Sequence, residues 1–293
     1  MISRRTFLKA AGLIGLAACS RNAADTDPAE SREPKAFTPT ASPTRPPDPG
    51  PESTPLPSVT PTETKCKSGR WGNPFLPDHE VTHGDTSRPV VLMTYDDYTV
   101  EEPDFGKSNF DKILTAYNDR GCKTTFFLPG GYDAPDTIFQ IASTVERIVA
   151  EGHTLGCHGV LHEPMTTYPD WLIRKNLAIW TDYMEIIIPG YEVRYFRAPF
   201  GDVDGRVRSI FAEYGMQSVL WSVESNGMVP ETYSKVVGVV KPGDIVLSHS
   251  QRPYDASLAG DILDGLLAKG FSVESVDTGL APEDYPFDPC KAG

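Results

Sequence analysis

Seven short apolar runs recur along the chain, and segments with helical periodicity separate them. The runs lie near residues 90–95, 122–128, 153–157, 193–197, 216–222, 243–248 and 271–275. Short runs that are apolar throughout are typical of strands buried on both faces of a parallel sheet. Strands that alternate with helices predict an α/β fold, whose parallel sheet is either open or closed into a barrel.

Two of the intervening segments are predicted to be helices with clear ends. The apolar positions of the first, residues 108–121, fall on one helical face: Phe110, Ile113, Leu114 and Tyr117. Gly121 follows this face directly, and glycine is the residue that most often ends a helix. Residues 136–152 show a similar pattern and end at Gly152 in the same way.

Residues 1–19 have the layout of a bacterial export signal, with a basic start, a short apolar stretch and small residues before Cys19. Residues 3–9 resemble the twin-arginine export motif, and residues 16–19 resemble a lipobox, in which the cysteine becomes the lipidated first residue. The alternative is an ordinary cleaved signal with an incidental cysteine. We favour a lipoprotein that is exported and anchored through Cys19 to the outer face of a bacterial membrane.

The next segment, residues 20–64, is predicted to be a flexible linker. It holds eleven of the 27 prolines and many serines and threonines, and it has no apolar periodicity with which to build a core. The folded domain therefore covers residues 65–293. Its strongly acidic balance, a formal net charge of −13 for the chain, argues against a nucleic-acid partner, because phosphate binding needs clustered Lys and Arg.

Four cysteines remain after Cys19, in a protein whose export would let disulfides persist. Cys66 and Cys290 lie at the two ends of the predicted domain, where a disulfide would join its termini. Cys122 opens one predicted strand and Cys157 closes another, so parallel neighbours would hold them apart. We expect these two to be buried thiols.

Polar residues follow five of the predicted strands at their carboxyl ends. They are Asp96 and Asp97, His158 and His162, Arg197, Glu224, and His249. Each alone fits an ordinary role, such as a surface histidine pair, an ion-pair arginine or a buried histidine. Their shared position favours a common site, because the carboxyl ends of barrel strands form the rim that carries active sites.

Four motifs in this order resemble the polysaccharide deacetylase (NodB-homology) family of carbohydrate esterases. They are TYDD at residues 94–97, HGVLH at 158–162, RAPFG at 197–201 and LSH at 247–249. The resemblance spans roughly residues 83–275 and implies a distorted (β/α) barrel with about seven parallel strands. It implies a single catalytic domain after the linker.

The resemblance gives the two adjacent acids different roles. Asp97 would join His158 and His162 as ligands of one divalent metal ion, with zinc expected and cobalt or nickel also suited to this set. Asp96 would act as the general base, oriented by Arg197.

Further roles follow from the resemblance for the later motifs. His249 would be the general acid, the Phe200 backbone N–H would bind the oxyanion, and Leu247 would line the acetyl pocket. His153 would be structural.

The sequence departs from the family pattern at two places. Tyr98 stands where the family usually has glycine, and we expect this bulky residue to narrow or reshape the rim. The fourth motif, roughly D-x-x-D-W, aligns with residues 224–228, where Gly227 and Met228 replace the Asp-Trp pair. The missing Asp normally tunes the catalytic histidine. Either Glu224 supplies this carboxylate to His249, or the acid is poorly tuned.

Three functions are compatible with these residues. The first is a metal-dependent hydrolase that removes acetyl groups from an extracellular polysaccharide or cell-wall glycan, with N-acetyl favoured and O-acetyl left open. The second is an impaired domain that binds metal and glycan without turnover, which Gly227 and Met228 motivate. The third, an iron-dependent oxygenase with the same two-His, one-carboxylate set, is disfavoured by the Arg197 and His249 motifs.

Overall fold

The computed structural model describes residues 80–132, 134 and 136–281. The predicted export signal, the linker of residues 20–64 and the Cys66–Cys290 pair lie outside the described residues. Cys122 and Cys157 are both free and buried, as predicted. Among the described helices, none is long and apolar enough to cross a membrane.

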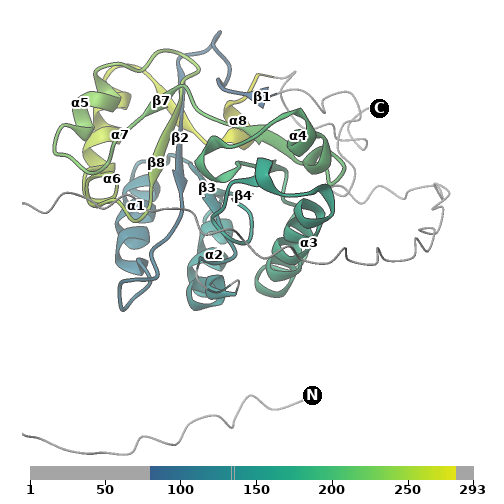
Figure 1. The fold of residues 1–293 in the computed structure, drawn as a ribbon. Helices are drawn as coiled ribbons and strands as arrows, with labels where there is room; N and C mark the ends of the chain where they lie inside the picture. Colours follow the sequence, from purple (N-terminus) through teal and green to yellow (C-terminus); the bar gives the residue numbers. More distant parts are fainter. Residues whose placement is uncertain (1–79, 133, 135, 282–293) are drawn as a thin grey trace, which may run out of the picture. The chain divides into compact units, whose positions relative to one another are not determined.

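All strands of the described region belong to one parallel sheet (Figure 1). They are β1 (Glu80–Val81), β2 (Val90–Asp96), β3 (Thr125–Leu128), β4 (Thr154–Cys157), β5 (Tyr195–Phe196), β6 (Gln217–Val219), β7 (Val223–Glu224), β8 (Ile245–His249) and β9 (Ser272–Glu274). The spatial order is β1-β6-β5-β4-β3-β2-β8-β7, and β9 pairs with the first half of β2. The seven predicted strands are therefore present.

One predicted strand ends early, and the strand that follows it pairs on the other side of the barrel. The predicted run covers residues 216–222, but β6 ends at Val219 and pairs with β5, whereas β7 begins only at Val223, beyond that run, and pairs with β8. The short segment between them thus joins the two sides of the sheet. Parallel pairing and barrel curvature confirm the predicted fold class.

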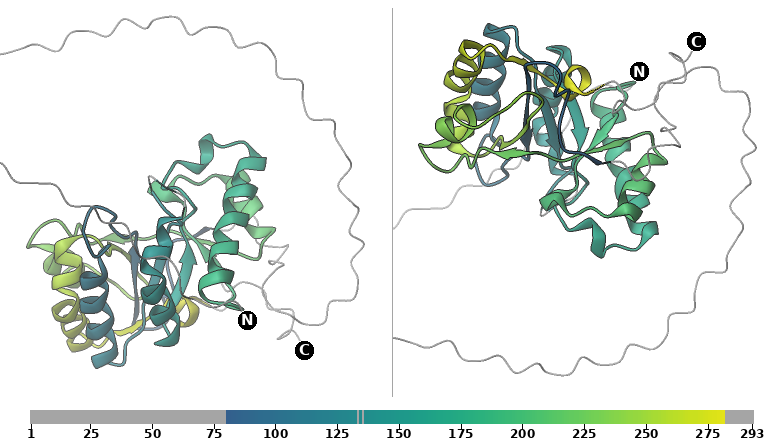
Figure 2. Two further views of the ribbon diagram at one scale, coloured as in Figure 1. Left: turned by 90° about the horizontal axis from the view of Figure 1, so that it is seen from below. Right: turned by 90° about the horizontal axis from the view of Figure 1, so that it is seen from above.

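Helices surround the outside of this barrel (Figures 1 and 2). The α-helices are α1 (Lys107–Asp119), α2 (Ala142–Ala150), α3 (Asp170–Ile187), α4 (Gly205–Ala212), α5 (Thr232–Val237), α6 (Pro253–Ser257), α7 (Ala259–Ala268) and α8 (Val276–Gly279). Three 3-10 helices are η1 (Thr137–Ile141), η2 (Met165–Thr167) and η3 (Pro199–Gly201). Neighbours pack in the order α4, α3, α2, α1, α7, α5.

The two predicted helices are confirmed with one change. Helix α1 buries the predicted face, and the chain turns after it at Gly121, whose φ is 66°. The segment 136–152 forms η1 followed by α2, rather than one continuous helix, and Gly152 (φ 79°) ends it. Glycine adopts a positive φ without steric strain, and this explains why a glycine ends both helical segments.

The alternation of side chains along β2 separates an apolar base from a polar rim inside the barrel. Val91, Met93 and Tyr95 face the surrounding helices, whereas Val90 and Leu92 face the barrel interior. Because side chains alternate with a period of two, Thr94 and Asp96 share the interior face. The interior is therefore apolar at the amino ends of the strands and polar at their carboxyl ends.

Candidate active site

The two acids of β2 leave the strand in different directions. Asp96 is its last residue and remains on the interior face. Asp97 adopts a left-handed conformation with φ of 68°, which is unusual for a residue with a side chain. Its N–H is fixed by the Phe127 carbonyl at 3.0 Å. Strained backbone conformations of this kind are common at functional sites. Phe200 (φ 62°) and Asn226 (φ 51°), which lie in two of the later motifs, are also left-handed.

Arg197 is completely buried and binds Asp96. Its Nη1 donates to Asp96 Oδ1 at 2.6 Å and to Thr94 Oγ1 at 2.8 Å. Its other nitrogens donate to the main-chain carbonyls of residues 219 and 220, both at 2.9 Å. The guanidinium also lies 4.2 Å from the centre of the Phe127 ring. Burial lowers the pKa of Arg197, and the neighbouring Asp96 opposes that shift. The arginine thus fixes Asp96 in one orientation.

Asp97, His158 and His162 converge on one point. Asp97 Oδ1 lies 3.6 Å from His158 Nε2 and 3.4 Å from His162 Nε2, and the three potential ligand atoms lie within 4.8 Å of one another. Asp97 Oδ1 is buried and has no hydrogen-bond partner, whereas Oδ2 accepts a hydrogen bond from Gln251 at 3.1 Å. A buried carboxylate oxygen without a hydrogen-bond partner calls for another partner, and a metal ion would satisfy it.

The tautomer of His158 also suits a metal ion. Its Nδ1 lies 2.7 Å from the carbonyl oxygen of Arg197 and must donate to it, because a carbonyl only accepts. The lone pair is therefore left on Nε2, which faces Asp97. Outer hydrogen bonds of this type orient the imidazoles of metal centres. The residues present thus fit one divalent cation with two nitrogen ligands and one oxygen ligand.

The protonation of the cluster agrees with this fit. Burial raises the pKa of Asp97, but the imidazoles of His158, His162 and His249 outweigh it and leave this pKa below its ordinary value. Burial lowers the pKa of His162, and Asp97 only partly opposes the shift. A lowered carboxyl pKa and a lowered imidazole pKa each favour the form of that group, carboxylate or neutral imidazole, that binds a metal ion.

His249 lies at the end of β8 on the edge of the cluster. Its Nε2 is 4.0 Å from Asp97 Oδ2 and 3.4 Å from Arg252 Nη2. Burial lowers the pKa of His249, and Arg252 adds to that shift. Leu247 is buried two residues earlier on the same strand, and so shares the face of His249. Glu224 is half exposed and binds Arg252 Nη1 at 3.4 Å, so its carboxylate contacts that cation rather than the imidazole.

The acid that lies against His249 is one that the sequence reasoning missed. Asp255, in helix α6, is 1% exposed, and its Oδ2 accepts the main-chain N–H of His249 at 2.9 Å. Burial raises the pKa of Asp255 to about 6. Asp255 lies six residues downstream of His249 in a segment with no motif. In the sequence, the only indication of Asp255 was its position six residues after the LSH motif.

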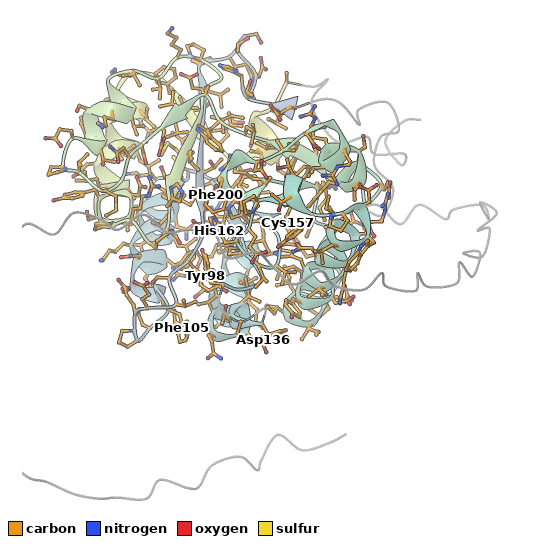
Figure 3. All side chains as sticks on the ribbon, viewed as in Figure 1. Tyr98, Phe105, Asp136, Cys157, His162 and Phe200 are labelled. Atoms are coloured by element: carbon orange, nitrogen blue, oxygen red, sulfur yellow. The ribbon has the colours of Figure 1, made fainter. Side chains whose placement is uncertain are left out.

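Phe200 presents its side chain to solvent beside His162. The ring is 65% exposed, and its centre lies 4.4 Å from that of His162 (Figure 3). Gly201 and Asp202 donate the hydrogen bonds of this turn. The role of the Phe200 N–H toward an oxyanion stays a prediction.

Tyr98 and His153 are both core residues. Tyr98 is 1% exposed and shares a hydrogen bond with Thr137 Oγ1 at 2.8 Å, so it packs in the core. Its expected effect on the rim, narrowing or reshaping, stays a prediction. His153 is buried, and its Nδ1 accepts the N–H of Thr124 at 3.3 Å. This placement agrees with a structural role.

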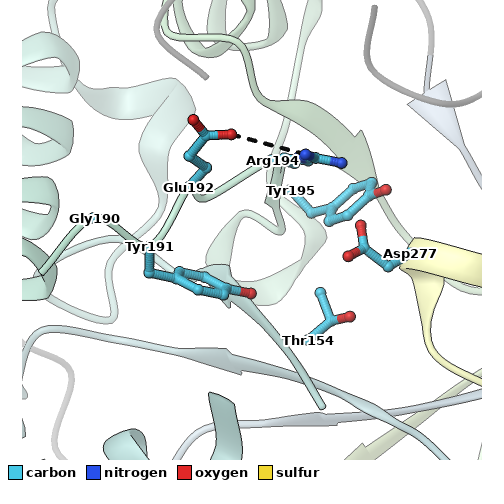
Figure 4. Close-up of a pocket in the computed structure, with 7 residues that line it drawn as sticks. All are labelled: Thr154, Gly190, Tyr191, Glu192, Arg194, Tyr195 and Asp277. Carbon is cyan, nitrogen blue, oxygen red and sulfur yellow. Dashed lines mark ion pairs between the residues drawn. The ribbon is translucent and has the colours of Figure 1, made fainter. Parts of the chain in front are cut away.

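A separate pocket lies at the opposite end of the barrel (Figure 4). Its lining residues are Thr154, Gly190, Tyr191, Glu192, Arg194, Tyr195 and Asp277. Thr154 and Tyr195 are the first residues of β4 and β5, so the pocket faces away from the carboxyl ends. Arg194 and Glu192 pair across it at 3.8 Å. This pocket does not include the cluster of Asp97 and the two histidines.

Comparison with known proteins points to one family. Residues 83–219 match the family described as polysaccharide deacetylase. An uncharacterised 30.6 kDa protein of Geobacillus stearothermophilus is 26% identical over 204 residues, which cover 66% of this chain and 72% of that protein. A chitooligosaccharide deacetylase of Sinorhizobium fredii is 27% identical, over 60% of this chain and 78% of the enzyme. A chitin deacetylase of Cryptococcus neoformans is 29% identical, over 61% of this chain and 41% of the enzyme.

Solved structures show the same fold. A CE4 family pseudoenzyme from Bacillus anthracis superposes with a TM-score of 0.62 at 22% identity, covering 70% of this chain and 69% of the other. The chitin deacetylase of Colletotrichum lindemuthianum superposes with a TM-score of 0.60 at 20% identity, covering 72% of this chain and 96% of the other. At these identities the likeness concerns the fold alone, so neither activity nor inactivity follows from it.

Proposed function

We propose that this chain, which carries a polysaccharide deacetylase domain, is a metal-dependent hydrolase that removes acetyl groups from an extracellular glycan. One observation carries the proposal. Asp97 Oδ1 is buried without a hydrogen-bond partner, faces two imidazole nitrogens, and lies next to an acid held by a buried arginine. Two of the relatives are named as a chitin deacetylase and a chitooligosaccharide deacetylase, and these names support the same reaction.

The metal ion would be held by Asp97, His158 and His162, with zinc favoured and cobalt or nickel as alternatives. When bound, such an ion would polarise a carbonyl group and lower the pKa of water at the site. Asp96 would accept a proton from the attacking water. Its Oδ1 is engaged by Arg197, while Oδ2 lies 3.9 Å from His158 Nε2 and so faces the cluster. Arg197 thereby presents one free oxygen of the base to the reaction.

The remaining groups act on the substrate as the tetrahedral carbon forms and collapses. The Phe200 N–H binds the developing oxyanion. His249 gives a proton to the departing amine, or to a departing alcohol if the bond is an ester. Leu247 lines the space for the acetyl methyl group, because it lies on the same face of β8 as His249. An N-acetylated sugar is the favoured substrate, and an O-acetylated glycan such as xylan is the alternative.

A glycan-binding module without turnover is the second candidate. Gly227 and Met228 replace the family's Asp-Trp pair, and Met228 and Phe200 leave large apolar surfaces exposed near the rim motifs, at 59% and 65%. The retained Asp96 and His249 count against this candidate, because binding alone does not need a base or an acid.

The location is also part of the proposal. The export signal of residues 1–19, the lipidation of Cys19 and the linker of residues 20–64 would place the domain outside the cell, tethered to a membrane. Acetylated wall or secreted polysaccharides are then within its reach.

Acetate release tests the proposal. The purified protein, loaded with zinc or cobalt, is incubated with N-acetylglucosamine oligomers, peptidoglycan fragments and O-acetylated xylan, beside the Asp96→Asn variant. Asp264→Asn is the matched control, because Asp264 is an exposed acid on α7 whose partner is Arg120. Metal-dependent release by the wild type and the control, but not by Asp96→Asn, is expected. Tight metal and glycan binding without acetate from any substrate would favour the binding module.

A further inference from the structure

The loop after β7 and the helix after β8 meet beside His249. The carbonyl of Gly227 accepts the N–H of Tyr254 at 3.0 Å, so the loop lies directly against the first turn of α6. The next residue, Asp255, points its carboxyl group at the same place. A Cβ added to Gly227 would overlap that carboxyl group. A side chain at position 227 and the carboxyl group of Asp255 therefore compete for one space.

Asp255 occupies this space and binds the main chain of His249. Its Oδ2 accepts the main-chain N–H of His249, and its Oδ1 is buried without a partner. His249 Nδ1 is also a buried polar atom without a hydrogen-bond partner, and the Ser225 side chain lies close enough to the Asp255 carboxyl group to lower its pKa. Such unpartnered atoms are uncommon in folded proteins, and two of them at the meeting point of β8, the 225–228 loop and α6 mark a polar site built for more than packing.

We propose that Asp255 is the positioning carboxylate of His249, supplied by α6 in place of the acid absent at Gly227. This rests on the proposed deacetylase function, in which His249 is the general acid. The carboxylate fixes the main chain of His249 by accepting its N–H at 2.9 Å and so sets the place of the imidazole. Its negative charge lies in the same buried region, where a cationic form of the imidazole must be stabilised during proton transfer. Glu224 is not available for this task because it binds Arg252.

Four variants test the assignment against a merely structural role. Asp255→Asn keeps the size and an oxygen acceptor for the His249 N–H but removes the charge. The double variant Gly227→Asp with Asp255→Gly moves the acid to the loop. Gly227→Asn with Asp255→Gly has the same packing without the charge. Asp264→Asn removes an exposed acid elsewhere and serves as the control.

In steady-state kinetics, Asp255→Asn is expected to lower kcat by at least about tenfold, within the range that general acid catalysis supplies, with KM and metal content unchanged. The double variant Gly227→Asp with Asp255→Gly is expected to restore kcat to within a few-fold of the wild type. The double variant Gly227→Asn with Asp255→Gly is expected not to restore it. Equal kcat values for the two double variants, or an unchanged kcat for Asp255→Asn, would overturn the assignment. Loss of metal content in Asp255→Asn would also overturn it, in favour of a structural role.

A second readout does not depend on turnover. Acylation of His249 by diethyl pyrocarbonate, followed by mass spectrometry on the metal-loaded protein, reports the reactivity of its imidazole. We expect a severalfold slower reaction in Asp255→Asn and recovery only where the acid is moved to 227. If the wild type released no acetate, the proposed function would fail, and this labelling would still decide the role of Asp255. Equal labelling in all four variants would contradict that role.

Discussion

Replacing Asp96 by Asn is expected to destabilise the metal-free domain as well as to stop turnover. Arg197 is fully buried, and Asp96 Oδ1 is its only carboxylate partner within 4 Å among the described residues. The variant would leave a guanidinium charge in the barrel interior opposite a neutral amide. Its hydrogen bonds to Thr94 and to two main-chain carbonyls persist, but these groups carry no charge.

The size of the loss follows from this burial. Breaking a buried ion pair by removing one partner costs about 3–5 kcal/mol, because the remaining charge is left uncompensated. Asn retains one oxygen that can accept from Arg197, and its neutrality relieves repulsion from the adjacent Asp97. We therefore expect the lower end, about 3 kcal/mol. For a domain of this size that is a fall in Tm of about 6–12 °C.

Urea unfolding of the metal-free wild type, Asp96→Asn and Asp264→Asn measures this loss. The exposed Asp264 pair with Arg120 is screened by solvent, so its removal is expected to leave the unfolding midpoint nearly unchanged. An Asp96→Asn protein as stable as Asp264→Asn would refute the view that Asp96 balances a buried charge.

Three further outcomes are expected. Zinc added to the metal-free protein at about 100 times its dissociation constant should stabilise the fold by about 2.7 kcal/mol, and His162→Gln should abolish the gain; equal gains in both would contradict the site. His153 is buried with its pKa lowered to about 4, so between pH 6.5 and pH 4 the unfolded chain binds a proton that the folded protein does not. When the pH is lowered from 7 to 4.5, the free energy of unfolding should therefore decrease by about 2 kcal/mol more in the wild type than in His153→Gln. Urea unfolding at these two pH values would show this difference. Burial raises the pKa of Cys157 to about 12, so peptide mapping should find it alkylated only after unfolding.

The strands were predictable because each is an apolar run that ends near a glycine or a polar motif. The early end of the predicted run 216–222 at Val219 and the separate strand β7 at Val223–Glu224 were not, since each depends on the neighbour with which the strand pairs. Strand β1 is only Glu80 and Val81, too short for any periodicity to show. Sequence patterns report burial and period, whereas the closing of a barrel depends on contacts between distant segments.

The cluster of Asp97, His158 and His162 was predictable because its three residues lie in motifs at the ends of strands, and the topology brings those ends together. Asp255 was not, because its position depends on the absence of a side chain at Gly227, which lies 28 residues earlier. From the sequence, Gly227 indicated only that an acid was missing. Only the packing of α6 against the 225–228 loop shows that Asp255 occupies the space that a side chain at position 227 would fill.

Metal reconstitution tests the central claim most directly. The metal-free protein is titrated with zinc or cobalt while acetate release from an N-acetylglucosamine oligomer is followed, with His158→Ala titrated in parallel. Acetate release that rises in proportion to the added metal, ends at one ion per chain and stays absent in His158→Ala is the predicted result. Full release from the metal-free protein, or equal release from the variant, would contradict a hydrolase that works through Asp97, His158 and His162.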